Sequence, residues 1–329
     1  MANAEATLSG FEQDSVKNIH ISGDVNFVVG SFNPSFAGYL NSLDDIDYVE
    51  PNRIYKAPFM PLSSASKPAV SRVVPSRRQK SIKKYQKREM ITQSGVPSWG
   101  ICRINQRERG DLASYTSDTS AGQGIDVYIF DTGINAEHPD FGGRAVRSEN
   151  FIDYEDNIDY AGHGTHVAGT IGGMTYGIAK NVQLHGVKIL DKNGDGSTAT
   201  LIEVFVSAGN TGDNACDYSP SANPDVFTVG ASDLQDAIPS FSSYGECVRI
   251  YAPGTNITST WMNDQSQTMD GTSMANPHVT GIAAMLMSER NFDSANDLYN
   301  TIIQIATPGV LKSPVEQTNL LLAYNGLER

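Results

Sequence analysis

Short, continuously apolar runs recur along residues 91–329, separated by stretches with helical periodicity. A strand without polar alternation is buried on both faces, as in a parallel sheet covered by helices. The stretch "TGIAAMLMSER" predicts a central helix that is apolar all round, and "SANDLYNTIIQIAT" predicts an amphipathic helix capped by Ser294. Alternating strands and helices predict an α/β domain built on a parallel sheet. The predicted strands lie in "GIDVYIFDTGI", "VQLHGVKILD", "VFVSAGN" and "DVFTVGASD".

The first 90 residues follow a different pattern. Residues 20–56 contain the strand-like run "NFVVGSF" and the alternating stretch "IDYVEPNRIY", which predicts an edge strand ended by Pro51. Residues 57–90 lack apolar periodicity and carry nine Lys or Arg against one acid, Glu89. Their prolines and serines predict a disordered linker, with a nuclear-localisation or nucleic-acid patch as the alternative. The chain therefore divides into residues 1–56, 57–90 and 91–329.

The net charge of −13 conceals this asymmetry, because residues 91–329 carry twelve Lys or Arg against twenty-eight Asp or Glu. An acidic body argues against nucleic acid as the main partner. No apolar run approaches the roughly 20 residues of a membrane-spanning helix, so no membrane partner is expected. The stretch "MANAEATLSGFEQDS" has neither the basic start nor the apolar core of a secretory signal, so no signal peptide is visible in this chain.

Three polar residues stand where function collects in a parallel sheet, beyond the carboxyl ends of the strands. Asp131 ends a buried strand, whereas His163 in "GHGTHVAG" and Ser273 in "DGTSMANPHVTG" begin predicted helices. Taken singly, they also suit a turn acid, a helix-start hydrogen bonder and an N-cap. Together they are the parts of a nucleophilic relay, in one of its known orders along a chain. The glycines beside His163 and Ser273 favour this second interpretation, because they let the backbone approach closely.

These motifs resemble those of the subtilisin-like serine proteases, and the proteinase K branch most of all. The resemblance rests on "DTGI", "HGTHVAGT" and "GTSMANPHVTG", and extends through "GVKILD", "SAGN", "YSPSANPDVFTVGASD" and "TNLLLAYNG" over residues 96–327. It implies a three-layer subtilisin-like domain in residues 91–329. It also implies a serine endopeptidase that forms an acyl-enzyme, with Asp131, His163 and Ser273 as its triad.

The same resemblance assigns further residues of the site. Asn210 in "SAGN" matches the family's oxyanion-hole asparagine, which donates its side-chain amide to the tetrahedral oxyanion together with the backbone N–H of Ser273. His166 and His278 lie within the family motifs but have no proton-transfer role there. We therefore expect both histidines to be structural, and we expect no cofactor in catalysis.

The stretches "FAGYL" and "DYVEPN" resemble the inhibitory prodomain of the same family. This resemblance implies that residues 1–56 form a truncated α+β prodomain that inhibits its own chain, so that the protein is made as a zymogen. The alternative is an unrelated α/β appendage. Residues 57–90 are then the processing region, with cleavage expected after Lys87-Arg88 or near Met90 and Ile91. Family habit implies a secreted or vacuolar protein that cuts proteins or peptides.

Cysteine usage is sparse, since the chain holds only Cys102, Cys216 and Cys247. Relatives of this branch carry a disulfide at the last two positions, and the resemblance implies the same bridge here. Two buried thiols are the alternative. We expect Cys102 to be a buried core residue outside any bridge.

The resemblance also bears on a structural calcium ion. Proteinase K-like relatives hold one ion with backbone oxygens near Pro224 and Val226 and with a downstream carboxylate. In this chain Arg249 stands in place of that acid. Calcium needs several oxygen ligands and little positive charge nearby, so we expect this site to be lost.

The chain departs from the family pattern between "GVKILD" and "VFVSAGN". Only thirteen residues separate Leu190 from Val204, near the minimum for a parallel crossover. Relatives have a helix, a substrate-pairing strand with a Gly-Gly motif and a second helix there. We therefore expect an internally shortened domain with an incomplete cleft and exposed apolar sheet surface.

Because of this shortening, a second function is the alternative. The chain would then be a catalytically inactive, truncated or splice-variant protein that acts by binding. An α/β-hydrolase esterase is excluded, because the sequence has no G-x-S-x-G elbow.

Overall fold

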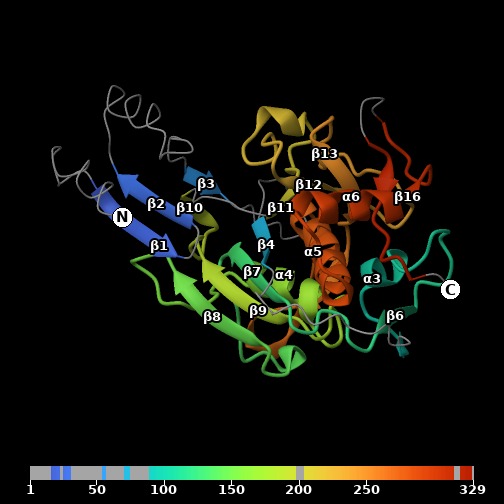
Figure 1. The fold of residues 1–329 in the computed structure, drawn as a ribbon, viewed down its shortest axis with the longest axis horizontal. Coiled ribbons are helices and arrows are strands. Elements are labelled where there is room, and N and C mark those ends of the chain that lie inside the picture. Colours follow the sequence, from blue (N-terminus) through green and yellow to red (C-terminus); the bar gives the residue numbers. More distant parts are fainter. Residues whose placement is uncertain are drawn as a thin grey trace. The chain divides into compact units, whose positions relative to one another are not determined.

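A computed structural model gives the fold of the chain (Figure 1). The chain forms two compact units, one of residues 1–53 with residues 198–200, the other of the remaining residues. In the first unit, β1 (Val16–Ser22) and β2 (Val25–Gly30) pair as an antiparallel hairpin. The structure describes residues 16–22, 25–30, 54–56, 70–74, 89–197, 204–314 and 319–327.

The second unit is built on a nine-stranded sheet of described residues. Two groups of parallel strands, β8-β9-β7 and β11-β12-β13, lie on either side of β4, which is antiparallel to β7 and to β11. The predicted parallel α/β sheet is therefore confirmed. In sheet order the strands are β16 (Thr307–Pro308), β17 (Leu321–Leu322), β13 (Val248–Pro253), β12 (Phe227–Ser232), β11 (Val204–Ser207), β4 (Val70–Val74), β7 (Asp126–Asp131), β9 (Gln183–Lys188) and β8 (Ala145–Asn150).

Strand β4 comes from the segment that the sequence predicts to be a disordered linker, and that prediction is wrong for residues 70–74. Ser71 lies opposite Ile129 of β7 on one side and Phe205 of β11 on the other. The segment "VSRVV" is rich in β-branched residues, which favour strands. Without β4, two strand edges would present unpaired backbone groups, and with it the facing edges of β7 and β11 are both paired.

The helices that carry the candidate residues pack on one face of this sheet. Helix α4 contacts β7 and β9, α5 contacts β4, β11, β12 and β13, and the two helices contact each other (Figure 1). The Tyr299 ring of α6 packs edge-on against Phe205 and at a tilt against Phe227. The described helices are α3 (Trp99–Arg103), α4 (His163–Gly172), α5 (Thr272–Glu289) and α6 (Ala295–Ile305).

Smaller elements complete the second unit. Among the residues that the structure describes in this unit, three antiparallel pairs lie outside the large sheet and three 3-10 helices join other elements. The pairs are β5 (Met90–Ser94) with β6 (Ser114–Asp118), β14 (Ile257–Thr260) with β15 (Ser266–Met269), and β3 (Ile54–Lys56) with β10 (Asp195–Ser197). The 3-10 helices are η2 (Pro139–Phe141), η3 (Ala215–Asp217) and η4 (Met262–Asp264).

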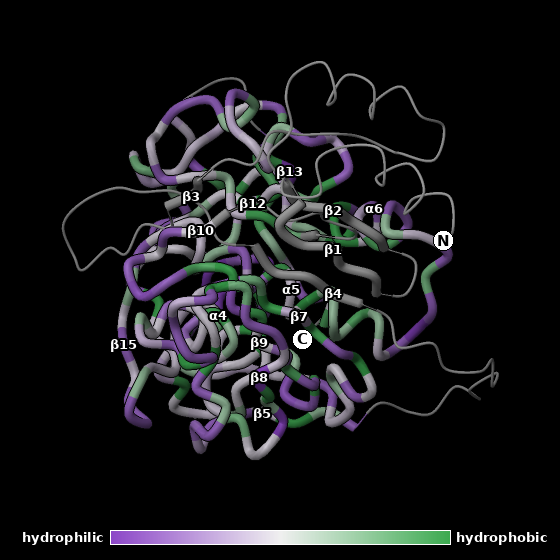
Figure 2. The backbone as a smooth tube through the Cα atoms, turned by 90° about the vertical axis from the view of Figure 1, so that its left-hand side faces the viewer, coloured by the Kyte–Doolittle hydropathy of each residue, from purple (hydrophilic) through white to green (hydrophobic). Residues whose placement is uncertain are grey.

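The main core fills the space between the sheet and α4, α5 and α6. Val127, Ile129 and Phe205 are almost fully buried there, and each such side chain stabilises the fold by about 1.5–3 kcal/mol. Hydrophobic residues concentrate on the inner strands and α5, and hydrophilic residues on the outer loops (Figure 2). The predicted central helix corresponds to α5, in which residues 272–286 are all buried. Small residues allow this packing: a Cβ on Gly281 would lie 2.8 Å from Ile178 Cβ.

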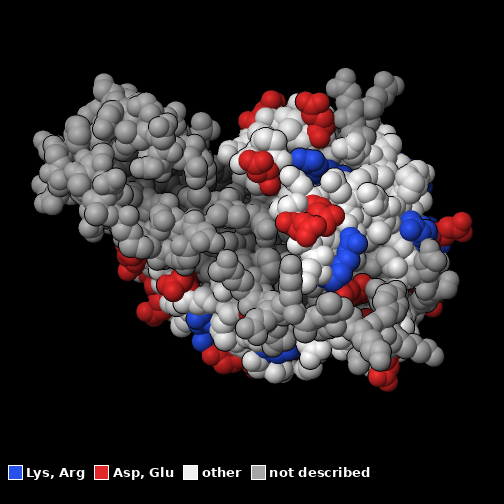
Figure 3. Space-filling view, in the orientation of Figure 1, with Lys and Arg blue, Asp and Glu red and all other residues white. Residues whose placement is uncertain are grey.

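The surface follows the charge balance of the sequence. On the face shown in Figure 3, acidic side chains are spread over the described surface among fewer basic ones. Within the described residues, no helix has the length and apolarity that a membrane crossing requires.

Replacing Ser71 by proline tests whether β4 belongs to the sheet. Proline has no N–H, and a strand paired on both sides uses every N–H in its ladders. We expect Ser71→Pro to lower the free energy of unfolding by about 1–3 kcal/mol, measured by denaturant titration. The matched Ser71→Thr variant keeps the N–H and suits a strand, so it retains wild-type stability. Equal stability of the proline variant would show that residues 70–74 lie outside the sheet.

Candidate active site

Asp131 and His163 meet at the edge where β7 ends and α4 begins. Both side chains are almost fully buried. The imidazole Nδ1 of His163 lies 2.7 Å from Asp131 Oδ1 and 2.9 Å from Oδ2, so Nδ1–H donates to the carboxylate. The backbone N–H of Thr132 also donates to Oδ1, at 2.7 Å. This arrangement fixes the imidazole so that its Nε2 points away from the acid.

Thr132 and Asp159 tie the end of β7 to the start of α4. The Thr132 hydroxyl donates to Asp159 Oδ1 at 2.7 Å and accepts from the backbone N–H of Gly164 at 3.0 Å. The Asp159 carboxylate also accepts from the backbone N–H groups of Gly162 at 2.8 Å and Thr165 at 2.9 Å, so it satisfies the free donors of the helix N-terminus. The sequence analysis missed both residues, although an acid just before a predicted helix start is a recognisable signal.

The glycines beside His163 are required by close contacts. Gly162 has a φ of +82°, and a Cβ there would lie 2.6 Å from the Trp261 ring. A Cβ on Gly164 would lie 2.1 Å from the carbonyl oxygen of Gly133. No side chain fits at either position. The sequence-based expectation that these glycines allow close backbone approach is therefore confirmed.

Ser273 and Asn210 lie where β11 and α5 approach each other. Ser273 is the second residue of α5 and is 4% exposed. The Asn210 Oδ1 accepts from the backbone N–H and the hydroxyl of Thr272, both at 2.8 Å. A Cβ on Gly271 would lie 3.3 Å from Asn210 Nδ2 and 3.7 Å from the backbone nitrogen of Ser273. These two donors therefore border one small space that glycine leaves open.

The sheet brings the two halves of the site to one edge. Because β7 and β11 both run antiparallel to β4, they run in the same direction, and their carboxyl ends lie on the same side. Asp131 ends β7, and Asn210 follows the end of β11. The helices that begin at His163 and just before Ser273 pack against each other. The structure thus brings Asp131 into contact with His163, and Asn210 into contact with Thr272, the residue directly before Ser273.

Charge distribution distinguishes His163 from the histidines around it. Burial is the largest single influence on the pKa of His163 and lowers it, because it disfavours the charged imidazolium. The charge of Asp131, its hydrogen bond to the ring and the charge of Asp159 together outweigh burial, so the pKa of His163 is raised above its ordinary value. Burial and the neighbouring His163 lower the pKa of His166 to about 3, and burial lowers the pKa of His278 to about 4. Of these three histidines, His163 is the one whose pKa is raised.

The other two histidines of the motifs have structural contacts. His166 Nε2 lies 3.0 Å from the carbonyl oxygens of Ile257 and Gln267, so the ring ties α4 to the β14–β15 hairpin. His278 Nδ1 lies 2.9 Å from the carbonyl oxygen of Met274, one turn earlier in α5. These contacts fit the structural role expected for both.

Cys216 and Cys247 form the disulfide that the resemblance implies, with their Cα atoms 5.4 Å apart. Two buried thiols, the alternative, are therefore excluded. Cys102 is a buried thiol outside this bridge, as expected, and its Sγ lies 3.8 Å from the Ser98 carbonyl oxygen.

The residues at the expected calcium position do not fit a calcium ion. The guanidinium of Arg249 donates to the Pro224 carbonyl oxygen at 2.8 Å. This bond places a positive charge on an oxygen that the ion would need as a ligand. Within the described residues, no three His, Cys, Asp or Glu side chains gather as a metal site.

Comparison with known proteins identifies the family. The pattern of the Subtilase family matches residues 122–205 and 202–321. A subtilisin-like serine protease of Sarocladium strictum, AsES, is 42% identical over 281 positions, covering 71% of each chain. A subtilisin-like protease of Coccidioides posadasii is 34% identical and covers 91% of this chain and 80% of its own length. The crystal structure of a cold-adapted subtilisin-like serine proteinase superposes with a TM-score of 0.64 at 33% identity, covering 70% of this chain and 98% of that one.

The same matches locate the shortened region. The two matched pieces of the family pattern meet at residues 202–205, directly before and within the start of β11. The alignment with the Sarocladium protein spans 281 positions, although 71% of 329 residues is only about 234, so that relative carries residues with no counterpart here. With the motifs, the sheet and the solved neighbour in agreement, the chain belongs to the subtilase family of serine proteases.

Proposed function

We propose that the chain is a serine endopeptidase that hydrolyses peptide bonds through Asp131, His163 and Ser273. The observation that carries the proposal is the buried hydrogen bond between His163 Nδ1 and the Asp131 carboxylate, at the head of the helix that packs against α5. A bond at Nδ1 leaves Nε2 as the proton acceptor. The raised pKa of His163 suits a group that takes up a proton in the reaction.

In this mechanism each proton has a defined route. His163 Nε2 removes the hydroxyl proton of Ser273 while Oγ attacks the substrate carbonyl carbon, and Asp131 stabilises the resulting imidazolium. His163 then gives the proton to the leaving amine, and the acyl-enzyme remains on Ser273. Water, deprotonated by His163, attacks the acyl carbon, and His163 returns this proton to Ser273 Oγ as the acid is released. The relay uses side chains alone, so we propose no cofactor for catalysis.

Asn210 and the Ser273 backbone N–H form the proposed oxyanion hole. Thr272 holds the Oδ1 atom of Asn210 through two hydrogen bonds, which leaves Nδ2 to donate. A fixed donor of this kind stabilises the developing negative charge without reorganisation during the reaction.

We also propose that the N-terminal region inhibits the site before maturation. Strand β3 pairs antiparallel with β10, which follows shortly after the end of β9. An extended substrate binds a protease by adding a strand to such an edge, and β3 occupies the edge in its place. The Coccidioides relative supports a family origin for this region, because its 91% coverage exceeds what residues 91–329 supply. Cleavage at Lys87-Arg88, or near Met90, would complete maturation.

The disulfide between Cys216 and Cys247 supports a place outside the cytosol, because such bonds persist in oxidising compartments. We therefore propose a secreted or vacuolar enzyme that acts on proteins or peptides.

A second candidate function is that of a catalytically inactive binding protein. It is favoured by the family segment that is missing before Val204, which in relatives contains the substrate-pairing strand. A chain of this kind would keep the fold and bind peptides without cutting them.

Labelling with a fluorophosphonate probe separates the two functions. The serine oxygen displaces fluoride from the probe only when its proton is removed, so we expect the folded wild type to be labelled at Ser273 and Ser273→Ala to stay unlabelled. Ser232→Ala is the matched control, because Ser232 is a buried serine whose hydroxyl has no hydrogen-bond partner among the described residues. Absence of label on folded wild-type protein would favour the inactive function.

The pH dependence of labelling tests the role of Asp131. Neutral His163 is the base, and its pKa is raised, so labelling is lost as the pH falls through a value above the ordinary value of about 6.5. Asp131→Asn removes the charge that raises this pKa, so the midpoint moves to lower pH and the plateau rate falls by roughly 10⁴, as in other triad enzymes. Asp140→Asn, a change at another buried acid, leaves the midpoint in place. An unchanged midpoint in Asp131→Asn would contradict the proposed relay.

Asn210→Asp tests the oxyanion hole. The variant keeps an oxygen that accepts from Thr272 but loses the donating amide, so we expect the labelling rate to fall by ~10²–10³, the range established for subtilisin. The control is Asn214→Asp, at an asparagine whose Oδ1 accepts from the backbone N–H of Cys216. A wild-type rate in Asn210→Asp would remove Asn210 from the site.

A further inference from the structure

Lys188 places a fully buried ammonium group close to the candidate site. It is the last residue of β9 and lies opposite Asp131 in the parallel register of β7 and β9. Its Nζ donates to the carbonyl oxygens of Thr132 and Leu190, both at 2.9 Å, and lies 3.1 Å from Glu155 Oε2. An ammonium has three donors, and here each has an acceptor.

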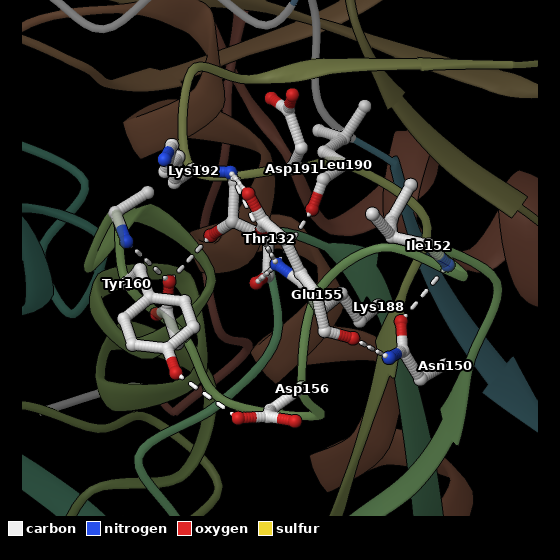
Figure 4. Close-up of polar contacts among 12 residues, drawn as sticks. Thr132, Asn150, Ile152, Glu155, Asp156, Tyr160, Lys188, Leu190, Asp191 and Lys192 are labelled. Atoms are coloured by element: carbon white, nitrogen blue, oxygen red, sulfur yellow. Dashed lines mark hydrogen bonds and ion pairs between the residues drawn. The ribbon is translucent and has the colours of Figure 1, made fainter.

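Glu155 anchors this ammonium from the loop between β8 and α4. Its side chain is only 8% exposed. The carboxylate also accepts from the backbone N–H of Lys192, at 3.2 Å and 3.1 Å from its two oxygens. Figure 4 shows Glu155 between Lys188 and Lys192, with Thr132 and Leu190 beside it. One ion pair thus joins the loop before α4, the end of β7 and the turn after β9.

A buried ion pair is a weak source of stability. Removing two charges from water costs several kcal/mol, and well-packed apolar residues of similar volume often stabilise a protein as well or better. The contacts of Lys188 therefore indicate that it holds neighbouring groups in place, rather than that it adds to the free energy of unfolding. The carbonyl oxygen that Lys188 holds belongs to Thr132, the residue that directly follows Asp131.

The polar groups of Thr132 are all engaged once Lys188 is included. Its N–H donates to Asp131 Oδ1, its hydroxyl joins Asp159 to the start of α4, and its carbonyl oxygen accepts from Lys188. The peptide units before and after the Thr132 Cα atom are thereby each held by a hydrogen bond, one through the N–H and one through the carbonyl oxygen. Hydrogen bonds to both peptide units limit rotation about the two backbone torsions of Thr132, which helps to keep its N–H directed at the Asp131 carboxylate.

We propose that Lys188, anchored by Glu155, is a positioning residue for the Asp131–His163 pair. The inference rests on the proposed function, since it assigns a role in the same relay. Lys188 touches neither substrate nor reacting atoms, and it acts through Thr132. Loss of its ammonium frees the peptide unit after Thr132, which loosens the backbone torsions of Thr132, so that Asp131 orients His163 poorly while the fold and the probe-binding surface remain.

The first test is Lys188→Met, which keeps the length of the side chain and removes the donors. We expect the maximal rate of fluorophosphonate labelling to fall roughly 10- to 100-fold, as for other small misplacements of catalytic groups, with the half-saturating probe concentration unchanged. In the Ser273→Ala background, the low-field proton resonance of the His163 Nδ1–H is expected to shift upfield or broaden. This resonance reports the Asp131–His163 bond directly, without any turnover.

Glu155→Gln is the second variant, in case Lys188→Met does not fold. It keeps the shape and the acceptor oxygen of the anchor but removes its charge, so we expect a smaller change of the same kind in both readouts. Lys180→Met is the matched control: Lys180 Nζ also donates to two backbone carbonyls, of Met174 at 2.8 Å and Gly177 at 2.9 Å, but not to Thr132. We expect Lys180→Met to label at the wild-type rate with an unchanged resonance.

The outcomes separate this inference from the proposed function. Unlabelled wild-type protein would overturn the proposed function, and the proton resonance would still decide whether Lys188 positions Asp131. A labelled wild type with unchanged rate and resonance in folded Lys188→Met or Glu155→Gln would overturn the positioning role. Equal changes in Lys180→Met would show that the effect is general destabilisation, which also overturns it.

Discussion

The site depends on one constraint, the backbone pairing that holds β7 and β11 one strand apart. Asp131 ends the first of these strands, and Asn210 follows the second. With β4 between them, the two strands are separated by two strand spacings of about 4.8 Å, or about 10 Å in all. This separation determines how far the Asp131–His163 pair lies from the Asn210–Thr272 contact. A sheet that collapsed or opened here would separate the two halves of the site.

The pairing explains how a shortened chain keeps a complete set of site residues. The missing family segment lies between β10 and β11, and a sheet cannot leave the facing edges of β7 and β11 unpaired inside a packed domain. Strand β4 satisfies both edges, although it runs antiparallel and comes from a segment far upstream. Local contacts then complete the geometry. Thr132 and Asp159 fix α4 to β7, and Asn210 fixes α5 to β11, so each half is rigid in itself.

The sequence predicted the parts of this structure that depend on local pattern. Continuous apolar runs identified the parallel strands, and glycine-rich motifs identified Asp131, His163 and Ser273 because helix starts and strand ends have strong residue preferences. The resemblance to the family predicted the Cys216–Cys247 disulfide. It also predicted that Arg249 stands at the calcium position near Pro224. Strand β4 was missed, because its composition is that of a linker and its pairing partners lie far away in sequence. Lys188 and Glu155 were missed for a related reason: a buried ion pair has no local signal until the fold brings its members together.

The N-terminal region therefore has two opposite relations to the peptidase domain. Strand β3 pairs with β10, and under the proposed inhibition it occupies an edge that a substrate would use, so that its departure would open the site. Strand β4 pairs with β7 and β11, so its departure would expose two rows of backbone groups beneath α5 and loosen the elements that carry the site. Residues 57–69 separate the two strands along the sequence. A cut on the carboxyl side of β4 leaves its hydrogen bonds intact, because strand pairing depends on the backbone contacts and not on chain continuity. The backbone pairing of β4 that completes the sheet would thus also hold the neighbouring segment that carries β3, and so oppose the release that the proposed inhibition requires.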